Sequence, residues 1–215
     1  YKDKDTNNDK HKDNDKDQDQ DKESKKKHND TDSYKDKYTY KYNYKIKDKG
    51  KGNTKSPPAA PTQKDREANF YMIGSMGLAS SIGLGVALCK PDKNVIIIDG
   101  DGNVLMAMGT LAMIAAEAPE NLIHVVIDNE VYESTGSQRS LSGKVKLEEV
   151  ARSVGYKNVL RVEKKGEIKA AFLKMKDSTG PNFLLIKVEP GFDTATGRVT
   201  HTPEEITDRF MQAIS

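Results

Sequence analysis

The chain has 215 residues and a formal net charge of +2, so its total charge predicts neither a nucleic-acid nor a membrane partner. Its single cysteine, Cys89, excludes an internal disulfide and a cysteine-based zinc site, and favours a reducing, cytoplasmic setting. No apolar run approaches the ~18 residues that a membrane-spanning helix needs, and the N-terminus lacks the apolar core of a secretory signal.

Two parts of unlike composition follow one another along the chain. Residues 1–63 consist largely of Lys, Asp, Asn, Gln, Ser, Thr and Tyr, and such a segment cannot bury enough apolar surface to offset the entropy of ordering. We therefore predict a disordered low-complexity tail that ends in the linker KGKGNTKSPPAAPTQ. The tyrosines of SYKDKYTYKYNYKIK alternate with polar residues, which would also fit a strand, although the tail is the favoured interpretation. Residues 64–215 are long enough for one domain.

Strand and helix patterns alternate along residues 64–215. A short apolar stretch at 70–76 leads into the first helix. The predicted elements in chain order are a helix at 78–89, a strand at 94–99, a helix at 104–118, a strand at 122–128, a loop at 129–143, a helix at 147–154 capped by Gly155, a strand at 159–162, a helix at 167–176, a strand at 183–188, and a helix at 203–214 with Thr202 as its N-cap. The strands at 94–99 and 122–128 are apolar without alternation, which is typical of strands covered on both faces. The alternation predicts an α/β domain with a mainly parallel sheet and helices on both faces.

The segment DGDGN, residues 99–103, places two glycines and an acid directly after an apolar strand. The plainest interpretation is a tight turn, because Asp and Gly are favoured turn residues. A calcium loop would also need a glycine at 104 and a glutamate at 110, where the chain has Val104 and Thr110. A dinucleotide fingerprint would need a glycine in place of Leu105, and a Gly-Lys-Ser/Thr phosphate loop is absent from this turn.

A magnesium–phosphate site remains as the alternative to a plain turn. Gly102 and Asn103 open a predicted helix, whose first N–H groups favour an anionic phosphate. Asp101 would repel that phosphate unless a divalent cation lay between them, and magnesium prefers carboxylate and amide oxygens together with phosphates. Asn129 follows the next strand of the predicted sheet, so we expect it beside Asp101 at the same sheet edge.

The stretch GDGNVLMAMGTLAMIAAEAPENLIHVVIDN resembles the thiamine diphosphate motif, in which a Gly-Asp-Gly turn is followed by a helix, a strand and an asparagine. The flanking segments FYMIGSMGLASSIGLGVAL and IDNEVYESTGSQ extend the resemblance. From about residue 64 to the C-terminus, the chain is similar to the diphosphate-binding domain of the sulfopyruvate and phosphonopyruvate decarboxylases. The similarity is strongest to the separate β subunit of the sulfopyruvate enzymes.

This resemblance implies two cofactors, thiamine diphosphate and Mg²⁺, and assigns residues to each. The side chains of Asp101 and Asn129 and the backbone carbonyl of Val131 would bind Mg²⁺. The other residues that it assigns to the cofactor are Gly74, Ser75, Met76, Gly100, Gly102, Asn103, Tyr132, Ser134 and Thr135.

Within the GSMG segment, the backbone of Gly74 and Met76 would meet the aminopyrimidine ring, and the Met76 side chain would bend the cofactor. Plain core packing is the alternative for Met76. Arg139 is either a contact for an anionic substrate group or a solvated side chain.

The chemistry implied by the resemblance is decarboxylation of a small anionic 2-oxo acid, sulfopyruvate or phosphonopyruvate, by the thiazolium carbanion of the cofactor. Members of this family activate the cofactor with a glutamate from a second, pyrimidine-binding domain. Residues 64–215 have no room for that domain. The resemblance thus implies a pyrimidine-binding α subunit as partner, a hetero-oligomer with the active site at the interface, and no catalytic residue in this chain.

Two other hypotheses remain open. The chain could serve another thiamine diphosphate enzyme, of the acetolactate synthase or 2-oxo acid oxidoreductase type, or it could be a truncated, non-catalytic subunit. The second hypothesis draws on a departure from the family pattern, in which another strand and helix precede the FYMIGSMG segment. A missing strand would leave a sheet edge or a core face uncovered. The intact Asp101, Asn129 and GSMG segment argue against lost cofactor binding.

Overall fold

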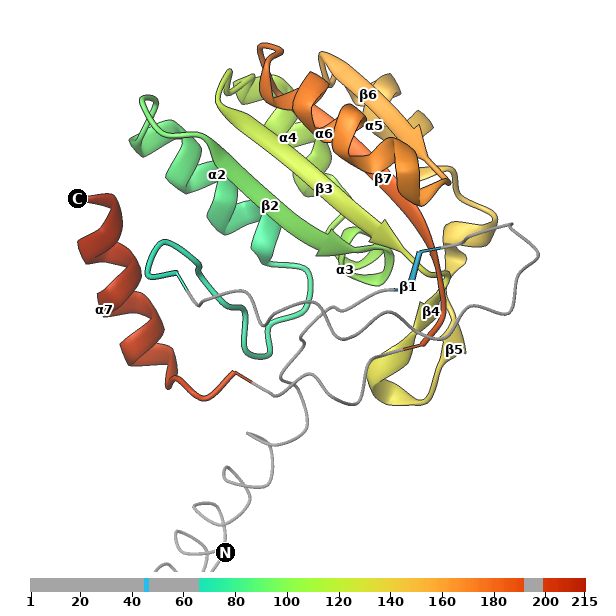
Figure 1. Cartoon of the computed structure of the whole chain (residues 1–215), viewed down its shortest axis with the longest axis horizontal. Helices are drawn as coiled ribbons and strands as arrows, with labels where there is room; N and C mark the ends of the chain where they lie inside the picture. Colours follow the sequence, from blue (N-terminus) through green and yellow to red (C-terminus); the bar gives the residue numbers. More distant parts are fainter. Residues whose placement is uncertain (1–44, 47–65, 192–198) are drawn as a thin grey trace, which may run out of the picture. The chain divides into compact units, whose positions relative to one another are not determined.

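The computed structural model describes residues 45–46, 66–191 and 199–215 (Figure 1). The predicted tail and linker, residues 1–63, lie outside the described residues except for residues 45–46, which form the short strand β1 (Lys45–Ile46). The domain boundary near residue 64 stays a prediction. Among the described residues, none of the helices combines the length and the apolar character needed to cross a bilayer.

A sheet of five strands organises the described part of the chain. Strands β2 (Val95–Gly100), β3 (Leu122–Asp128), β7 (Asn182–Glu189) and β6 (Asn158–Val162) run parallel, and β3 and β7 lie between the other two. β1 pairs antiparallel with the last residues of β7. The mainly parallel sheet expected from the strand–helix alternation is therefore confirmed.

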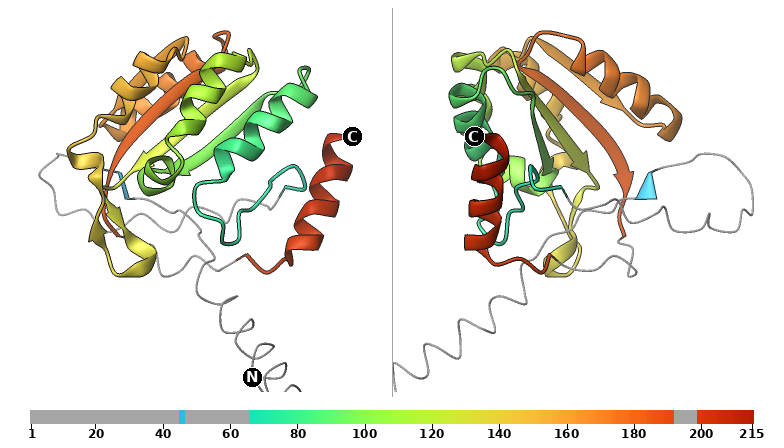
Figure 2. Two further views of the ribbon diagram at one scale, coloured as in Figure 1. Left: turned by 180° about the vertical axis from the view of Figure 1, so that it is seen from behind. Right: turned by 60° about the vertical axis from the view of Figure 1, so that its left-hand side comes forward.

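Helices cover both faces of this sheet (Figures 1 and 2). The α-helices are α2 (Ala79–Cys89), α3 (Asp101–Met106), α4 (Gly109–Glu117), α5 (Leu147–Val154), α6 (Ile168–Lys176) and α7 (Pro203–Ile214). The described residues also form three short 3₁₀ turns, η1 (Glu133–Thr135), η2 (Leu141–Gly143) and η3 (Lys165–Glu167). The helices predicted at 147–154 and 203–214 are confirmed to the residue, including the Gly155 cap and the Thr202 N-cap.

Two apolar cores lie on opposite faces of the sheet, because successive side chains of a strand point to opposite sides. In β3, Leu122 and Val126 enter the core beneath α2, α4 and α5, whereas Ile123 and Val125 enter the core beneath α6. All four side chains are nearly inaccessible to solvent. The prediction that β3 is covered on both faces is confirmed.

The same prediction for β2 is wrong. Ile96 and Ile98 are 46% and 59% exposed, although Ile97 between them is buried. β2 is the outermost strand on its side of the sheet among the described residues, and α6 packs over β6 and β7 instead. The run of β-branched residues favours a strand, but it carries no information about what covers each face.

The single helix predicted at 104–118 is two helices. α3 begins earlier, at Asp101, and a break at Ala107 and Met108 separates it from α4. Gly77 packs against this break, because a Cβ atom on it would lie 3.2 Å from the Cβ of Ala107. The helix thus starts immediately at the end of β2, which places Asp101 at the carboxyl edge of the sheet.

The strand register brings the predicted site residues together. Gly100, the last residue of β2, pairs with Ile127 of β3, so the residues that follow each strand leave the sheet side by side. After β3 the chain forms a small hairpin of β4 (Val131–Tyr132) and β5 (Gln138–Arg139), within the segment predicted as a loop. The carboxyl edge of a parallel sheet is where such folds bind ligands.

Candidate functional site

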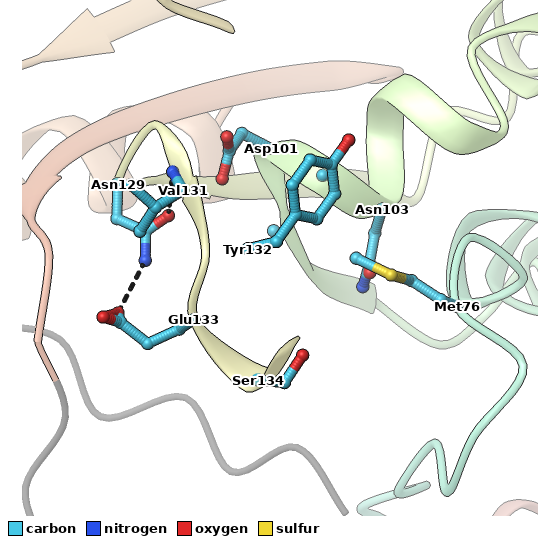
Figure 3. A pocket seen from close by; sticks show the side chains of 10 residues that line it. Met76, Asp101, Asn103, Asn129, Val131, Tyr132, Glu133 and Ser134 are labelled. Carbon is cyan, nitrogen blue, oxygen red and sulfur yellow. Dashed lines mark hydrogen bonds between the residues drawn. The ribbon is translucent and has the colours of Figure 1, made fainter. Parts of the chain in front are cut away.

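A pocket opens where β2 and β3 end (Figure 3). The residues that line it are Met76, Gly100, Asp101, Gly102, Asn103, Asn129, Val131, Tyr132, Glu133 and Ser134. All of them except Glu133 were expected to bind the cofactor or its cation. Gly74, Ser75 and Thr135 do not line the pocket, and Arg139 lies on β5, exposed and paired with Val131.

The GSMG segment forms a tight turn that carries Met76 into the pocket. Gly74 and Gly77 have positive φ angles of 75° and 94°, which glycine adopts readily, and Ser75 between them has a φ of 49°, which is uncommon for a residue with a side chain. Met76 is half-buried rather than part of either core, and its terminal methyl carbon approaches Gly102. The side chain therefore lies in the pocket wall, and the core-packing alternative does not describe it.

Gly102 lies directly beneath the ring of Tyr132. A Cβ atom at this position would be 2.5 Å from one ring carbon of Tyr132 and 3.1 Å from the methyl carbon of Met76. Any side chain larger than hydrogen would displace the ring, so the close approach requires glycine. Tyr132 and Met76 thus narrow the pocket above the start of α3.

Asp101 is 2% exposed and is held by two serines from the far end of the loop that follows β3. The hydroxyls of Ser140 and Ser142 both donate to its Oδ2, the latter over 2.9 Å. Ser142 Oγ also lies 2.7 Å from Oδ1 of Asp128. A hydroxyl carries one hydrogen, so Ser142 donates to one carboxylate at a time and bridges the two acids.

Lys187 of β7 compensates the charge of Asp128. Its Nζ is 2.9 Å from Oδ2 of Asp128, and the two side chains are 7% and 3% exposed. It also pairs with Glu130, whose side chain is 48% exposed. Burial raises the pKa of Asp101 and the charge of Asp128 raises it further, against the hydrogen bonds from Ser140 and Ser142 that lower it.

Asn129 is 4% exposed, and both ends of its amide are engaged. The side-chain oxygen Oδ1 accepts from the backbone N–H of Val131 over 3.1 Å, and Nδ2 donates to Oε2 of Glu133 over 3.2 Å. Figure 3 shows the amide nitrogen directed at Glu133, on the side away from Asp101.

The donor set suits a hard divalent cation together with a phosphate. Asp101 offers a carboxylate, Asn129 an amide oxygen and Val131 a backbone carbonyl, all in the wall of one pocket. Among the residues that the structure describes, no group of three or more His, Cys, Asp or Glu side chains could hold a metal ion. α3 has no side-chain N-cap, and the first N–H groups of a helix lack an intrahelical backbone acceptor, so this end suits an anion; the N–H of Gly102 bonds the carboxylate of Asp101.

Comparison with known proteins identifies the family. Residues 58–186, more than half of the chain, match the model of the thiamine pyrophosphate enzymes, C-terminal TPP binding domain. The chain belongs to this family. The match covers β2, β3, the hairpin and the whole pocket, and the recognition made from the Gly-Asp-Gly motif is confirmed.

Two relatives from this family illustrate the similarity. The chain is 42% identical over 154 residues to a phosphonopyruvate decarboxylase of Streptomyces viridochromogenes, covering 72% of this chain and 38% of that protein. It is 43% identical over 152 residues to the sulfopyruvate decarboxylase subunit beta of Methanocaldococcus jannaschii, covering 70% and 79%. The chain therefore spans less than two fifths of the phosphonopyruvate enzyme and most of the β subunit. Among solved structures, a thiamin diphosphate-dependent enzyme of Mycobacterium smegmatis has a TM-score of 0.49 at 19% identity, over 55% of this chain and 23% of that one.

Sequence reasoning missed the side chains that support the predicted ligands: Glu133, Ser140, Ser142 and Lys187. Ser140 and Ser142 are polar residues in a polar loop, where only the fold reveals that they reach Asp101. Lys187 sits in the apolar strand FLLIKV, and a lysine inside a buried strand is a signal for a buried acidic partner. Glu133 could have been found as the acid within the motif that already contained Tyr132.

Proposed function

We propose that the pocket binds thiamine diphosphate through Mg²⁺. Within the pocket, the side chains of Asp101 and Asn129 and the carbonyl of Val131 would bind the cation. The proposal is supported above all by the convergence of these three oxygen donors at the ends of neighbouring strands, in a domain whose family binds this cofactor. Ser140 and Ser142 both bind Oδ2 of Asp101, so Oδ1 would be the oxygen offered to the cation.

The remaining cofactor contacts follow from the shape of the pocket. Backbone N–H groups of Gly102 and Asn103 would hold the diphosphate, and the absence of a side chain at Gly102 admits the ring of Tyr132 against the start of α3. Met76 and Tyr132 would pack on the organic part of the cofactor and exclude water. When bound, the cofactor supplies a carbanion to attack a keto group and a sink for the electrons that decarboxylation releases.

The function that this site supports best is that of the cofactor-binding subunit of a 2-oxo acid decarboxylase. Relatives named as phosphonopyruvate decarboxylase and sulfopyruvate decarboxylase subunit beta support an anionic substrate of that kind. The name of the β subunit also supports a hetero-oligomer, in which a pyrimidine-binding α subunit contributes the activating glutamate. The chain on its own would then bind the cofactor without decarboxylating the substrate.

Cofactor binding is tested by titrating the full chain with thiamine diphosphate in the presence and absence of Mg²⁺, using isothermal calorimetry. We expect binding that requires Mg²⁺ and that Asp101→Asn abolishes, whereas Asp177→Asn, an exposed acid at the end of α6, leaves it unchanged. Cation-independent binding, or equal affinity in the Asp101→Asn variant, would contradict the proposed site.

Activity is tested after co-expression with a pyrimidine-binding subunit. Release of CO₂ from sulfopyruvate or phosphonopyruvate is expected only from the mixed complex, and acetolactate formation from pyruvate serves as the contrasting reaction. Turnover by this chain alone would contradict the two-subunit arrangement, and acetolactate as main product would favour a synthase instead.

A further inference from the structure

An asparagine that binds a cation must present its oxygen and not its nitrogen. The two ends of the amide have nearly the same shape, so packing alone does not select between them. The selection must come from hydrogen-bond partners that accept only or donate only. Asn129 has one partner of each kind.

The backbone N–H of Val131 donates to Oδ1 of Asn129 and thereby identifies the oxygen end. Glu133 identifies the other end, because an ionised carboxylate accepts hydrogen bonds and cannot donate them. The amide nitrogen is drawn toward Glu133, and the amide oxygen is left on the side of Asp101 (Figure 3).

Glu133 is itself held by donors from two other places in the fold. Its Oε2 accepts from the backbone N–H of Gly191, just beyond β7, over 3.0 Å. Its Oε1 accepts from the hydroxyl of Ser137, in the hairpin loop, over 3.3 Å. Both oxygens of Glu133 are therefore engaged, which suits a role in orienting Asn129 better than a role as a ligand.

We propose that Glu133 is the positioning residue of the cation site. It fixes the amide of Asn129 so that Oδ1 faces the cation, and it ties the β4–β5 hairpin to the end of β7. This inference rests on the proposed function, because it requires a cation at Asn129. Glu133 acts through Asn129 and does not contact the cation.

The pattern of hydrogen bonds predicts which replacements of Glu133 are tolerated. Glutamine can place its oxygen where Oε2 lies, accepting from both Asn129 and Gly191, and its amide nitrogen can donate to Ser137. Alanine removes the acceptor, so the Asn129 amide nitrogen loses its partner and the amide is no longer held in one orientation. Charge at position 133 is thus dispensable, whereas an acceptor is required.

The test measures the Kd for Mn²⁺, by electron paramagnetic resonance in the presence of thiamine diphosphate, on the full chain. Glu133→Ala should weaken Mn²⁺ binding by about tenfold or more, as loss of an outer-shell partner does in other metal sites. Glu133→Gln should recover affinity to within about threefold of the unmodified chain. Glu167→Ala, an exposed acid in η3, is the matched control and should change nothing.

A second pair of variants isolates the orientation itself. Aspartate at position 129 presents an oxygen in either orientation, so in an Asn129→Asp background the Glu133→Ala change should cost no affinity. It should even improve binding, because it removes a like charge beside the new carboxylate. This comparison is made between two variants that share the same starting point, so a loss of affinity there would come from the lost bonds of Glu133 to Ser137 and Gly191 and would overturn the role in orienting the amide.

Three results separate failure of the inference from failure of the proposed function. If the unmodified chain shows no cation-dependent cofactor binding, the proposed function itself is wrong. If the unmodified chain binds and Asp101→Asn does not, the site stands, and equal affinity in Glu133→Ala overturns the positioning role alone. If Glu133→Gln is as weak as Glu133→Ala, the carboxylate acts through its charge or as a ligand, which also overturns the inference.

Discussion

Lys187 carries a buried positive charge, and its removal should show how much this charge stabilises the buried carboxylate of Asp128. Substitution by Met keeps a long side chain in β7 but leaves Asp128 without its charge partner, in a position where the two side chains are 7% and 3% exposed. Removing one member of a buried ion pair costs about 3–5 kcal/mol, because the other charge stays buried and uncompensated. The hydrogen bonds that Asp128 accepts from Ser142 and from the N–H of Glu130 remain, so we expect the lower end of this range.

The expected loss of about 3 kcal/mol in the free energy of unfolding corresponds to a fall of about 6–12 °C in Tm for a domain of this size. Urea denaturation at neutral pH, without cofactor, measures it. Lys169→Met, an exposed lysine on α6, is the matched control and should stay within about 0.5 kcal/mol of the unmodified chain.

The double variant Lys187→Met/Asp128→Asn tests the cause of the loss. It removes both charges, so it should be more stable than Lys187→Met by about 2 kcal/mol. A Lys187→Met variant within about 1 kcal/mol of the unmodified chain would refute the reasoning, since the buried charge would then cost little. A double variant no better than the single one would show that the loss comes from packing.

Three further predictions concern the pocket. Ser142→Ala removes the bridge between Asp101 and Asp128, and should lower the free energy of unfolding by about 1–3 kcal/mol in urea denaturation and weaken Mg²⁺ binding in calorimetry. Gly102→Ala should abolish thiamine diphosphate binding by forcing Tyr132 from its place, and Tyr132→Ala in the same chain should relieve the strain on folding, seen as a recovered Tm. Burial raises the pKa of Asp101 from its ordinary value of 3.8, so between pH 3.8 and the raised pKa the folded chain holds a proton there that the unfolded chain has lost. The contribution of Asp101 to the free energy of unfolding is therefore fully present below pH 3.8 and is lost as the pH rises through the raised pKa. Urea denaturation at successive pH values should show this pH dependence in the unmodified chain and not in Asp101→Asn.

The sequence predicted those elements whose pattern is local. Strand β3 is mostly apolar and is buried on both faces, and the Thr202–Glu205 capping box marks the start of α7 without reference to anything distant. The place of β2 at the outside of the sheet depends on which strands pair, and no feature of the residues around Ile98 encodes that.

The same distinction separates the predicted ligands from their supports. Asp101 and Asn129 were found because each directly follows a strand, so sheet topology alone brings them together. Ser142 is 41 residues from Asp101, and Lys187 is 59 residues from Asp128, and these contacts depend on the path of the loops. The bonds made by Glu133 likewise join segments whose proximity only the folded chain reveals.

The segment from Asn129 to Ser142 contains two of the proposed cation ligands, Asn129 and Val131. It also contains Ser140 and Ser142, whose hydroxyls hold Asp101 in place. The proposed ligands and the residues that support them are thus encoded in one continuous stretch. Exchanging residues 129–142 as a unit between relatives would transfer the proposed ligands together with their hydrogen-bond partners. Exchanging single positions would separate each proposed ligand from the residue that orients it. If the proposed cation site is correct, a change of its metal preference is best made by exchanging residues 129–142 together rather than one residue at a time.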